Sequence, residues 1–155
     1  MHEKFMSEAI RLATEKMQNG DGGPFGAVIV MDGRIISRGW NQVTSTNDPT
    51  AHAEIVAIRN ACRQINNFSL AGGTLYVNCE PCPMCMAAAY WAEIATVYYG
   101  TTRKDAAAIG FADDHIHQEL SLPNEERVMN IKQIMRDQAL PAFALWESMA
   151  DKIKY

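Results

Sequence analysis

Three of the four cysteines in this 155-residue chain lie three residues apart, in the stretch NCEPCPMCMAAAYW. Cys79, Cys82 and Cys85 could hold an iron–sulfur cluster, form a redox dithiol, bind zinc or pack in the core. A cluster needs a fourth thiolate, and the only spare one, Cys62, falls inside an apolar predicted helix. A redox dithiol would use Cys82 and Cys85 but leaves the third cysteine unexplained. The cysteines alone therefore leave zinc and its competitors open.

A second group of candidate ligands lies upstream, in TAHAEIVAIR. His52 and Glu54 fall in the first turn of one predicted helix, and Cys82 and Cys85 fall in the first turn of another. Side chains there lean toward the helix N-terminus, whose partial positive charge favours thiolates. His52, Cys82 and Cys85 give three ligands and leave a tetrahedral position open, which is typical of catalytic rather than structural zinc. Glu54 is then suited to move a proton between water and substrate.

The first half of the chain predicts the elements that carry the upstream ligands. Residues 4–19 have the apolar spacing of an amphipathic helix, and FGAVIV-MDG-RIISRG predicts a β-hairpin that turns at Asp32-Gly33. A polar loop over residues 41–50 precedes a helix expected over residues 51–65. Asp48-Pro49-Thr50 is a suitable start signal for that helix, because Asp or Thr can cap it.

The second half predicts a crossover that carries the cysteines. A strand over residues 74–78, a helix over residues 83–92 and a strand over residues 95–100 favour a right-handed connection between parallel strands. Beyond them we expect a loop over residues 101–114, a strand over residues 128–135 and a helix over residues 141–152. The predicted fold class is α/β, a three-layer α/β/α domain spanning residues 1–155 around a central mixed five-stranded sheet.

Bulk properties narrow the class of function. The net charge is -4, and no dense cluster of Lys and Arg suggests a nucleic-acid surface. No stretch is long and apolar enough for a membrane span, and the N-terminus lacks the pattern of a signal peptide. We therefore expect a cytoplasmic protein that acts on a small molecule, with neither a nucleic-acid nor a membrane partner.

The two ligand groups together match a known signature. H-A-E followed by P-C-P-M-C fits H-x-E…P-C-x-x-C of the zinc nucleobase deaminases, and the chain resembles the cytidine/deoxycytidylate deaminase superfamily. The resemblance implies that superfamily's fold, with one Zn²⁺ per subunit held by His52, Cys82 and Cys85. It also implies that Glu54 moves the proton while zinc-activated water attacks the amino-bearing ring carbon. Cys79 falls outside the signature, and we expect it to pack beside the site.

Within the superfamily the chain most resembles the bacterial guanine deaminases, through GGPFGAVIV, NDPTAHAE, CEPCPMC, DAAAIGFADD and the terminal tyrosine. This resemblance implies hydrolysis of guanine to xanthine and ammonia in purine catabolism or salvage. It implies that Asn41 and Asp113 recognise the polar edge of the purine, with Asp113 also taking part in catalysis, and that Phe25 and Trp91 line its faces. The sequence reads Phe111-Ala112-Asp113-Asp114, so either acid could face the ligand.

The resemblance also implies a domain-swapped homodimer. A C-terminal segment of about residues 136–155 would be exchanged between subunits, and Tyr155 would contact the purine bound by the other chain. Alternatives remain at this stage: a deaminase of another base, a nucleoside, an aminated triazine or tRNA adenosine, or a non-catalytic zinc or iron–sulfur binding module. The module would need a fourth protein ligand.

Overall fold

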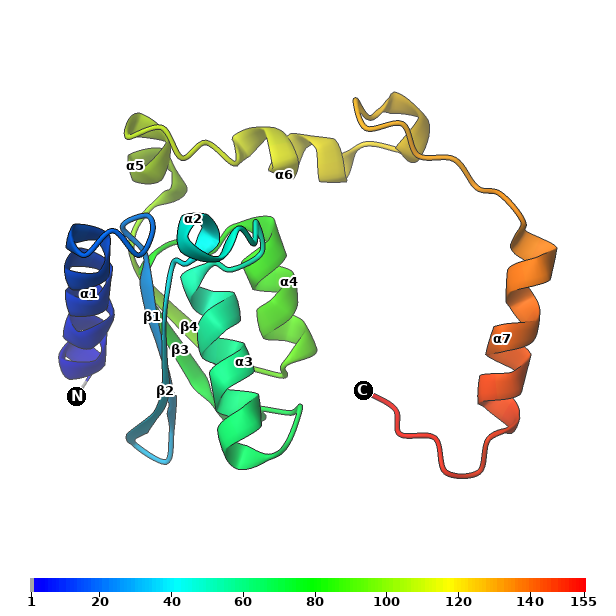
Figure 1. Cartoon of the computed structure of the whole chain (residues 1–155), viewed down its shortest axis with the longest axis horizontal. Coiled ribbons are helices and arrows are strands. Elements are labelled where there is room, and N and C mark those ends of the chain that lie inside the picture. Colours follow the sequence, from blue (N-terminus) through cyan, green and yellow to red (C-terminus); the bar gives the residue numbers. More distant parts are fainter. Residues whose placement is uncertain (1) are drawn as a thin grey trace. The chain divides into compact units, whose positions relative to one another are not determined.

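The structure is a computed structural model that describes residues 2–155. The chain forms two compact units, one ending at Asp114 and the other comprising His115–Tyr155. Figure 1 labels the helices and strands of both. None of the helices within residues 2–155 combines the length and the apolarity that crossing a bilayer requires.

A four-stranded mixed sheet forms the centre of the N-terminal unit. The strands β1 (Gly26–Met31), β2 (Arg34–Trp40), β3 (Thr74–Cys79) and β4 (Thr96–Thr101) lie in the order β2-β1-β3-β4. β1 is antiparallel to both β2 and β3, whereas β3 and β4 are parallel. The predicted hairpin and the predicted parallel pair are both confirmed.

The hairpin turn follows from its two residues. Asp32 and Gly33 have φ angles of 49° and 72°, and positive φ at both central positions is what a type I′ turn requires. Asp and Gly tolerate this backbone conformation better than other residues. The turn therefore returns β2 alongside β1 directly.

Helices cover both faces of the sheet, which confirms the three-layer arrangement (Figure 1). On one face α1 (His2–Gln18) packs Phe5 and Leu12 against Val28, Val30 and Tyr76. The other face carries α3 (Ala53–Ile65) and α4 (Pro83–Trp91). Small alanines on the inner side of α3 let it approach the sheet closely, and this second core is formed by Ala27, Ile29, Ala53, Ala57, Ala61, Leu70, Leu75, Val77 and Ala92.

The predicted fifth strand is wrong. Residues 128–135 have no regular secondary structure, although VMNIKQIM contains the apolar residues of a strand. Val128 and Met129 are 91% and 72% exposed. A strand is stabilised by its ladder and by burial of one face, and within the described C-terminal unit these residues have neither. The sheet consequently has four strands rather than five.

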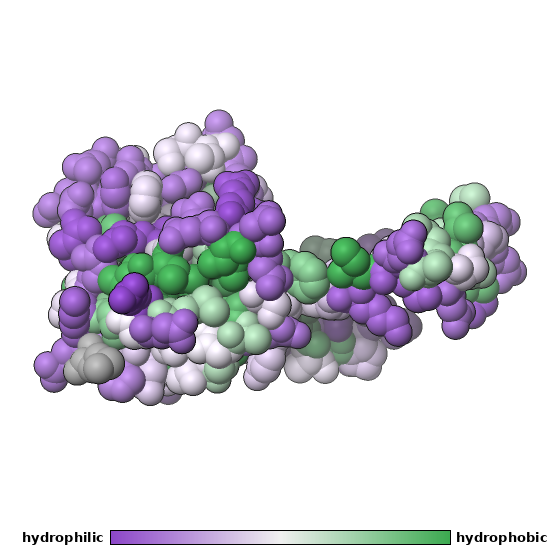
Figure 2. All heavy atoms as spheres, turned by 90° about the horizontal axis from the view of Figure 1, so that it is seen from below, coloured by the Kyte–Doolittle hydropathy of each residue, from purple (hydrophilic) through white to green (hydrophobic). Residues whose placement is uncertain are grey.

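The C-terminal unit follows α6 (Asp114–Ser121) with a 3₁₀ turn, Asn124–Glu126, and then α7 (Arg136–Ser148). The last helix begins five residues before the predicted start at residue 141, so Pro141 lies inside it. The prediction relied on the preference of proline for the first turn. On α7, Phe143 and Leu145 are 74% and 66% exposed, and the space-filling view shows apolar side chains at the surface (Figure 2).

Two further expectations about loops need correction. The loop expected over residues 101–114 contains α5 (Arg103–Ala108), which starts with a capping box between Thr102 and Asp105. The polar loop before α3 contains the short helix α2 (Val43–Thr46). Asp48 does not cap α3; instead its Oδ1 accepts hydrogen bonds from the backbone N–H and the hydroxyl of Thr50.

Candidate metal centre and active site

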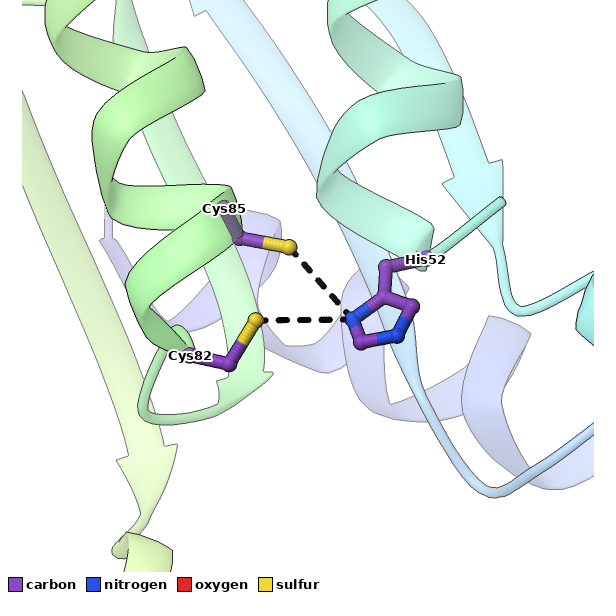
Figure 3. Close-up of side chains that lie close together, drawn as sticks. All are labelled: His52, Cys82 and Cys85. Carbon is purple, nitrogen blue, oxygen red and sulfur yellow. Dashed lines mark hydrogen bonds between the residues drawn. The ribbon is translucent and has the colours of Figure 1, made fainter. Parts of the chain in front are cut away.

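Two helix starts meet beside the sheet and bring the predicted ligands together. His52 is the N-cap residue of α3, Cys82 is the N-cap residue of α4, and Cys85 lies in the first turn of α4. The Nδ1 atom of His52 is 3.6 Å from Cys82 Sγ and 3.5 Å from Cys85 Sγ (Figure 3). All three ligand atoms lie within 4.8 Å of one another.

Close backbone packing fixes the start of α3. Gly39 in β2 lies so near this helix that a Cβ atom there would be 2.1 Å from the carbonyl oxygen of Ala53 and 2.5 Å from the nitrogen of Ala57. Only glycine fits such an approach. Because Ala53 follows His52 directly, the contact between Gly39 and α3 sets the height of the imidazole above the sheet.

Cys82 and Cys85 follow closely after the end of β3. Cys79 is the last strand residue, and the backbone N–H of Glu80 donates to the carbonyl of Thr101 at 2.8 Å, so the chain stays attached to β4. Pro83 then occupies the first turn of α4, where its missing N–H costs no helical hydrogen bond. The resulting turn presents Cys82 and Cys85 toward His52.

The spacing of these three ligand atoms fits a tetrahedral zinc ion. Zn–S bonds of about 2.3 Å and Zn–N bonds of about 2.0–2.1 Å at a tetrahedral angle place sulfur and nitrogen about 3.5 Å apart. The two sulfur–nitrogen distances of 3.6 and 3.5 Å agree with this value. The donor set, two thiols and an imidazole, also suits zinc. The group is therefore positioned to bind Zn²⁺ with a fourth position left for water or substrate.

The electrostatics favour a thiolate in this group. A hydrogen bond from the Cys85 thiol, together with the neighbouring imidazole, lowers the pKa of Cys82 to about 4 despite its burial. The same hydrogen bond to Cys82, and burial beside Glu54, raise the pKa of Cys85. The hydrogen bond to the Cys82 sulfur raises the pKa of His52. One negative charge is thus shared locally, which suits a site for a cation.

Glu54 lies beside these ligands and is only 6% exposed. Burial, which removes water from the carboxylate, raises the pKa of Glu54. A buried carboxyl with a raised pKa is the kind of group that general acid–base catalysis uses. Its position two residues after His52 brings it to the same cavity wall as the metal group.

A cavity of about 670 Å³ opens over the metal group within the N-terminal unit. This is within the range of roughly 300–1,000 Å³ that small-molecule sites occupy. His52, Glu54 and Cys82 line it, together with residues of the loop before β1 and of the segment after α5. The predicted site residues Phe25, Asn41 and Asp113 all line it.

Two phenylalanines form an aromatic wall of the cavity. The rings of Phe25 and Phe111 meet edge to face, with centroids 4.9 Å apart and planes at 89°. This is a favoured arrangement of aromatic rings. Apolar walls of this kind favour a planar ring as ligand.

Asn41 is buried in another wall. Its Oδ1 accepts hydrogen bonds from the backbone N–H groups of Gly23 and Val43, each at 3.2 Å. Among residues 2–155 its Nδ2 group has no hydrogen-bond partner. An amide held by its oxygen in this way keeps two N–H donors for a ligand.

The two neighbouring acids differ in position. Asp113 lines the cavity, whereas Asp114 begins α6 and pairs with Arg103, with 3.7 Å between Asp114 Oδ1 and Arg103 Nε.

The two remaining predicted substrate contacts, Trp91 and Tyr155, do not line the cavity of the N-terminal unit. Trp91 ends α4, the opposite end of the helix from the cysteines, and is 68% exposed. Tyr155 belongs to the C-terminal unit and is 82% exposed.

Several lining residues escaped the sequence prediction. Phe111, Glu80, Arg103 and Ala106 all line the cavity, and so does Cys79, which was expected only to pack beside the site. The capping box of Thr102 and Asp105 was the available signal for α5, which carries Arg103 and Ala106. No local pattern identifies Phe111, because its role depends on meeting Phe25, far away in the sequence.

Comparison with known proteins supports the metal group. A family model described as the cytidine and deoxycytidylate deaminase zinc-binding region matches residues 1–101, which include the three ligands and Glu54. The guanine deaminase of Bacillus subtilis (strain 168) is 47% identical over 154 residues, 99% of each chain. An X-ray structure of Bacillus subtilis guanine deaminase matches with a TM-score of 0.97, over 100% of this chain and 99% of that one.

More distant relatives share the same core. The tRNA-specific adenosine deaminase of Haemophilus influenzae is 36% identical over 163 residues, covering 97% of this chain and 94% of the relative. A solved guanine deaminase from Nitrosomonas europaea is 29% identical, with a TM-score of 0.66 over 70% of this chain and 63% of that one. The signature, the geometry of its residues and these similarities agree. The chain belongs to the cytidine and deoxycytidylate deaminase family.

Proposed function

We propose that this protein is a zinc-dependent guanine deaminase, which hydrolyses guanine to xanthine and ammonia. The observation that carries the proposal is the 47% identity to a guanine deaminase over 99% of both chains. The chemistry is consistent with the site: three metal ligands with an open position, and a buried carboxyl beside them. A non-catalytic zinc module would instead close its site with a fourth protein ligand.

The roles of the central residues follow from their chemistry. His52, Cys82 and Cys85 would hold the Zn²⁺ ion, which would supply Lewis acidity toward the attacking water. Glu54 takes the proton of that water and delivers it first to the ring nitrogen next to the amino-bearing carbon. It then takes the proton of the added hydroxyl and passes it to the amino nitrogen, so that the carbon–nitrogen bond breaks, ammonia leaves and the oxygen becomes the new carbonyl of xanthine. Its burial favours this cycle, because the loss of water around the carboxylate raises the pKa of Glu54 and makes it a stronger proton acceptor.

The cavity walls support recognition of a purine. Phe25 offers a ring edge or face to the planar base, supported by its contact with Phe111. Asn41 offers Nδ2 as a donor to acceptors of the base, because its Oδ1 is engaged with the backbone. Asp113 offers carboxylate oxygens to the N–H donors on the edge of guanine, and its negative charge favours the protonated states formed during turnover.

We further propose that the active enzyme is a homodimer in which the segment of residues 136–155 is exchanged. Support comes from α7, where Phe143, Leu145 and Trp146 are 74%, 66% and 42% exposed. Exposed apolar side chains gathered on one helix favour an interaction surface. Exchange of an identical segment is a low-cost route to a symmetric dimer. In the proposed dimer Tyr155 of the other chain completes the purine site.

A second candidate function is tRNA adenosine deamination, favoured by the 36% identity to the Haemophilus influenzae enzyme over 97% of this chain. The net charge of -4 weighs against it, since a tRNA surface needs clustered Lys and Arg. The deciding experiment measures ammonia release by the zinc-loaded protein from guanine, adenine and cytosine, and inosine formation in tRNA. We expect turnover of guanine alone. Inosine in tRNA without guanine turnover would contradict the proposal.

A further inference from the structure

Asn78, the penultimate residue of β3, makes an unusual pair of contacts with the loop that carries Phe25. Its Nδ2 donates a hydrogen bond to the carbonyl of Pro24 at 2.9 Å, and its Oδ1 accepts one from the backbone N–H of Gly26 at 2.8 Å. The two bonded groups stand directly before and directly after Phe25 in the chain. One amide side chain therefore holds the backbone on both sides of the aromatic wall.

The two hydrogen bonds of Asn78 lie directly beyond the last residue pair of the ladder between β1 and β3. The ladder between β1 and β3 stops at the pair Ala27 and Val77, one residue before Gly26 and Asn78 would meet. A backbone amide carries one donor and one acceptor, and the Asn side chain offers the same two functions. The side chain of Asn78 thus adds one further pair of hydrogen bonds between the end of β3 and the residues around the start of β1.

The loop that carries Phe25 has two other attachments, which contact different elements from those that Asn78 reaches. The backbone N–H of Asn41 donates to the Phe25 carbonyl at 3.0 Å, which fixes the loop to the segment after β2. Gly26 is pressed against α1, where a Cβ atom would be 2.3 Å from the Ala9 carbonyl oxygen. These two contacts attach the loop to the segment after β2 and to α1. Within residues 2–155, the two hydrogen bonds of Asn78 tie the loop to β3, which continues to Cys82.

We propose that Asn78 is a positioning residue that fixes the ring of Phe25 relative to the metal ligands and so orients the substrate ring. Cys82 lies four positions after Asn78 along the chain. The side chain therefore couples the aromatic wall to the strand that delivers the metal. This inference rests on the proposed function in one respect, namely that a planar ring lies against Phe25 during turnover.

The test compares Asn78→Asp with a matched control. Asp keeps the oxygen that accepts from Gly26 but places a second oxygen against the Pro24 carbonyl, so the loop is pushed away. The control is Asn60→Asp, because Asn60 Nδ2 also donates to a carbonyl, that of Arg38 at 3.0 Å, on the exposed surface. We expect kcat/KM for guanine to fall about tenfold in Asn78→Asp, as for loss of one oriented hydrogen bond. The control should keep wild-type kcat/KM, and both variants should keep wild-type zinc content.

A double-mutant cycle separates positioning from general support of the fold. In a Phe25→Leu background the Asn78→Asp change should alter kcat/KM by less than about twofold, because the ring that Asn78 orients is gone. A loss of equal size in both backgrounds, or a loss of zinc together with activity, would overturn the proposal. If Asn78→Asp does not fold, Asn78→Ser takes its place and is judged by the same criteria. This variant removes the amide that bonds to Pro24 and Gly26 without adding a charge.

A readout without substrate keeps this inference separate from the proposed function. Crystal structures of the wild type and of Asn78→Asp, both with zinc and without ligand, should show a displaced Phe25 ring and an unchanged metal group. An unmoved ring contradicts the positioning role, whatever the substrate is. Absence of ammonia release from guanine by the wild type contradicts the proposed function and leaves the comparison of ring positions decisive for Asn78.

Discussion

His52 Nδ1 and Cys85 Sγ lie 3.5 Å apart although the two residues are 33 positions apart in the chain. Between them the chain runs along α3, returns through β3 and enters α4, so both ligands stand at the starts of neighbouring helices. The distance depends on the packing of α3 and α4 on the same face of the sheet rather than on any local turn. A metal ion held there joins segments that no short stretch of sequence connects.

Removal of any one ligand should therefore release the metal. We expect His52→Ala, Cys82→Ala and Cys85→Ala each to lower zinc content and deamination together, because two protein ligands hold zinc poorly. Metal analysis of the purified variants and an ammonia assay check this. Cys62→Ala is the control and should retain zinc, since Cys62 hydrogen-bonds to the Phe68 carbonyl outside the metal group. A Cys79→Ala protein without metal would revive the three-cysteine cluster.

The proton-transfer role of Glu54 can be separated from metal binding. Glu54→Gln keeps the shape of the side chain but removes its basic oxygen. Zinc and guanine should still bind, while turnover should fall by roughly 10²–10⁴. Equilibrium binding and single-turnover rates measure the two effects independently. Near-normal turnover in this variant would show that another group moves the proton, with Asp113 the first to test.

The two neighbouring acids after Phe111 offer a matched pair. Asp113→Asn should lower kcat/KM for guanine by about tenfold or more, because a charged hydrogen-bond acceptor in the cavity is lost. Asp114→Asn should leave it within about twofold, since Asp114 pairs with Arg103 at an exposed position, where such pairs are weak. Steady-state kinetics of both variants decide the assignment. The reverse order of effects would place Asp114 at the ligand.

The proposed exchange of C-terminal segments makes a strong prediction about mixed dimers. Deleting residues 151–155 should raise KM for guanine or lower kcat and leave zinc content intact, because these residues are remote from the ligands in sequence. A heterodimer of the deleted chain with a Glu54→Gln chain should regain activity, since the intact tail then covers the intact Glu54. Failure to regain activity in a purified heterodimer would show that the tail does not complete the other subunit's site.

Stability at low pH should depend on Glu8. Hydrogen bonds from Arg11 and Arg38 lower the pKa of Glu8 to about 2, from a usual value of 4.5. A lowered pKa in the folded state stabilises the fold above about pH 4.5, and this contribution is lost as the pH falls toward about 2. Glu8→Gln should lower the free energy of unfolding by about 1 kcal/mol at pH 6, because both arginines are half exposed and solvent screens the pairs.

Denaturant unfolding of wild type and Glu8→Gln across this pH range measures the effect. The difference between the two proteins should shrink progressively below pH 4.5. Glu3→Gln, on the same helix, is the control for a general change of charge on α1. A difference that stays constant down to pH 2 would show that the ion pairs contribute nothing.

Local patterns predicted those parts of the fold that depend on short stretches. Asp32-Gly33 determines its own turn, and His52 and Cys82 combine a ligand type with a helix start. The strand expected at Val128 failed because strand formation depends on a partner, which apolar spacing does not supply. The helix α5 was missed although Thr102 and Asp105 form a local capping box, so that error was avoidable.

The contacts that refine the site are long-range and lie beyond pattern reading. Phe25 meets Phe111, and Asn78 holds the backbone around Phe25 across 52 to 54 residues. In sequence, Asn78 is one polar residue at the end of a strand, a position that any turn-forming residue could occupy. Its function follows only from which carbonyl and which N–H the fold places beside it.

The use of His52 as an N-cap residue has a consequence for the flexibility of the site. Its side chain makes no capping hydrogen bond to α3, and an effective cap is commonly worth about 1 kcal/mol. Thr102 gives that stabilisation to α5, whereas the first turn of α3 lacks it. The first turn of α3 therefore frays readily when His52 holds no metal. Removal of zinc should accelerate the exchange of amide hydrogens near residues 52–56, well before the sheet opens.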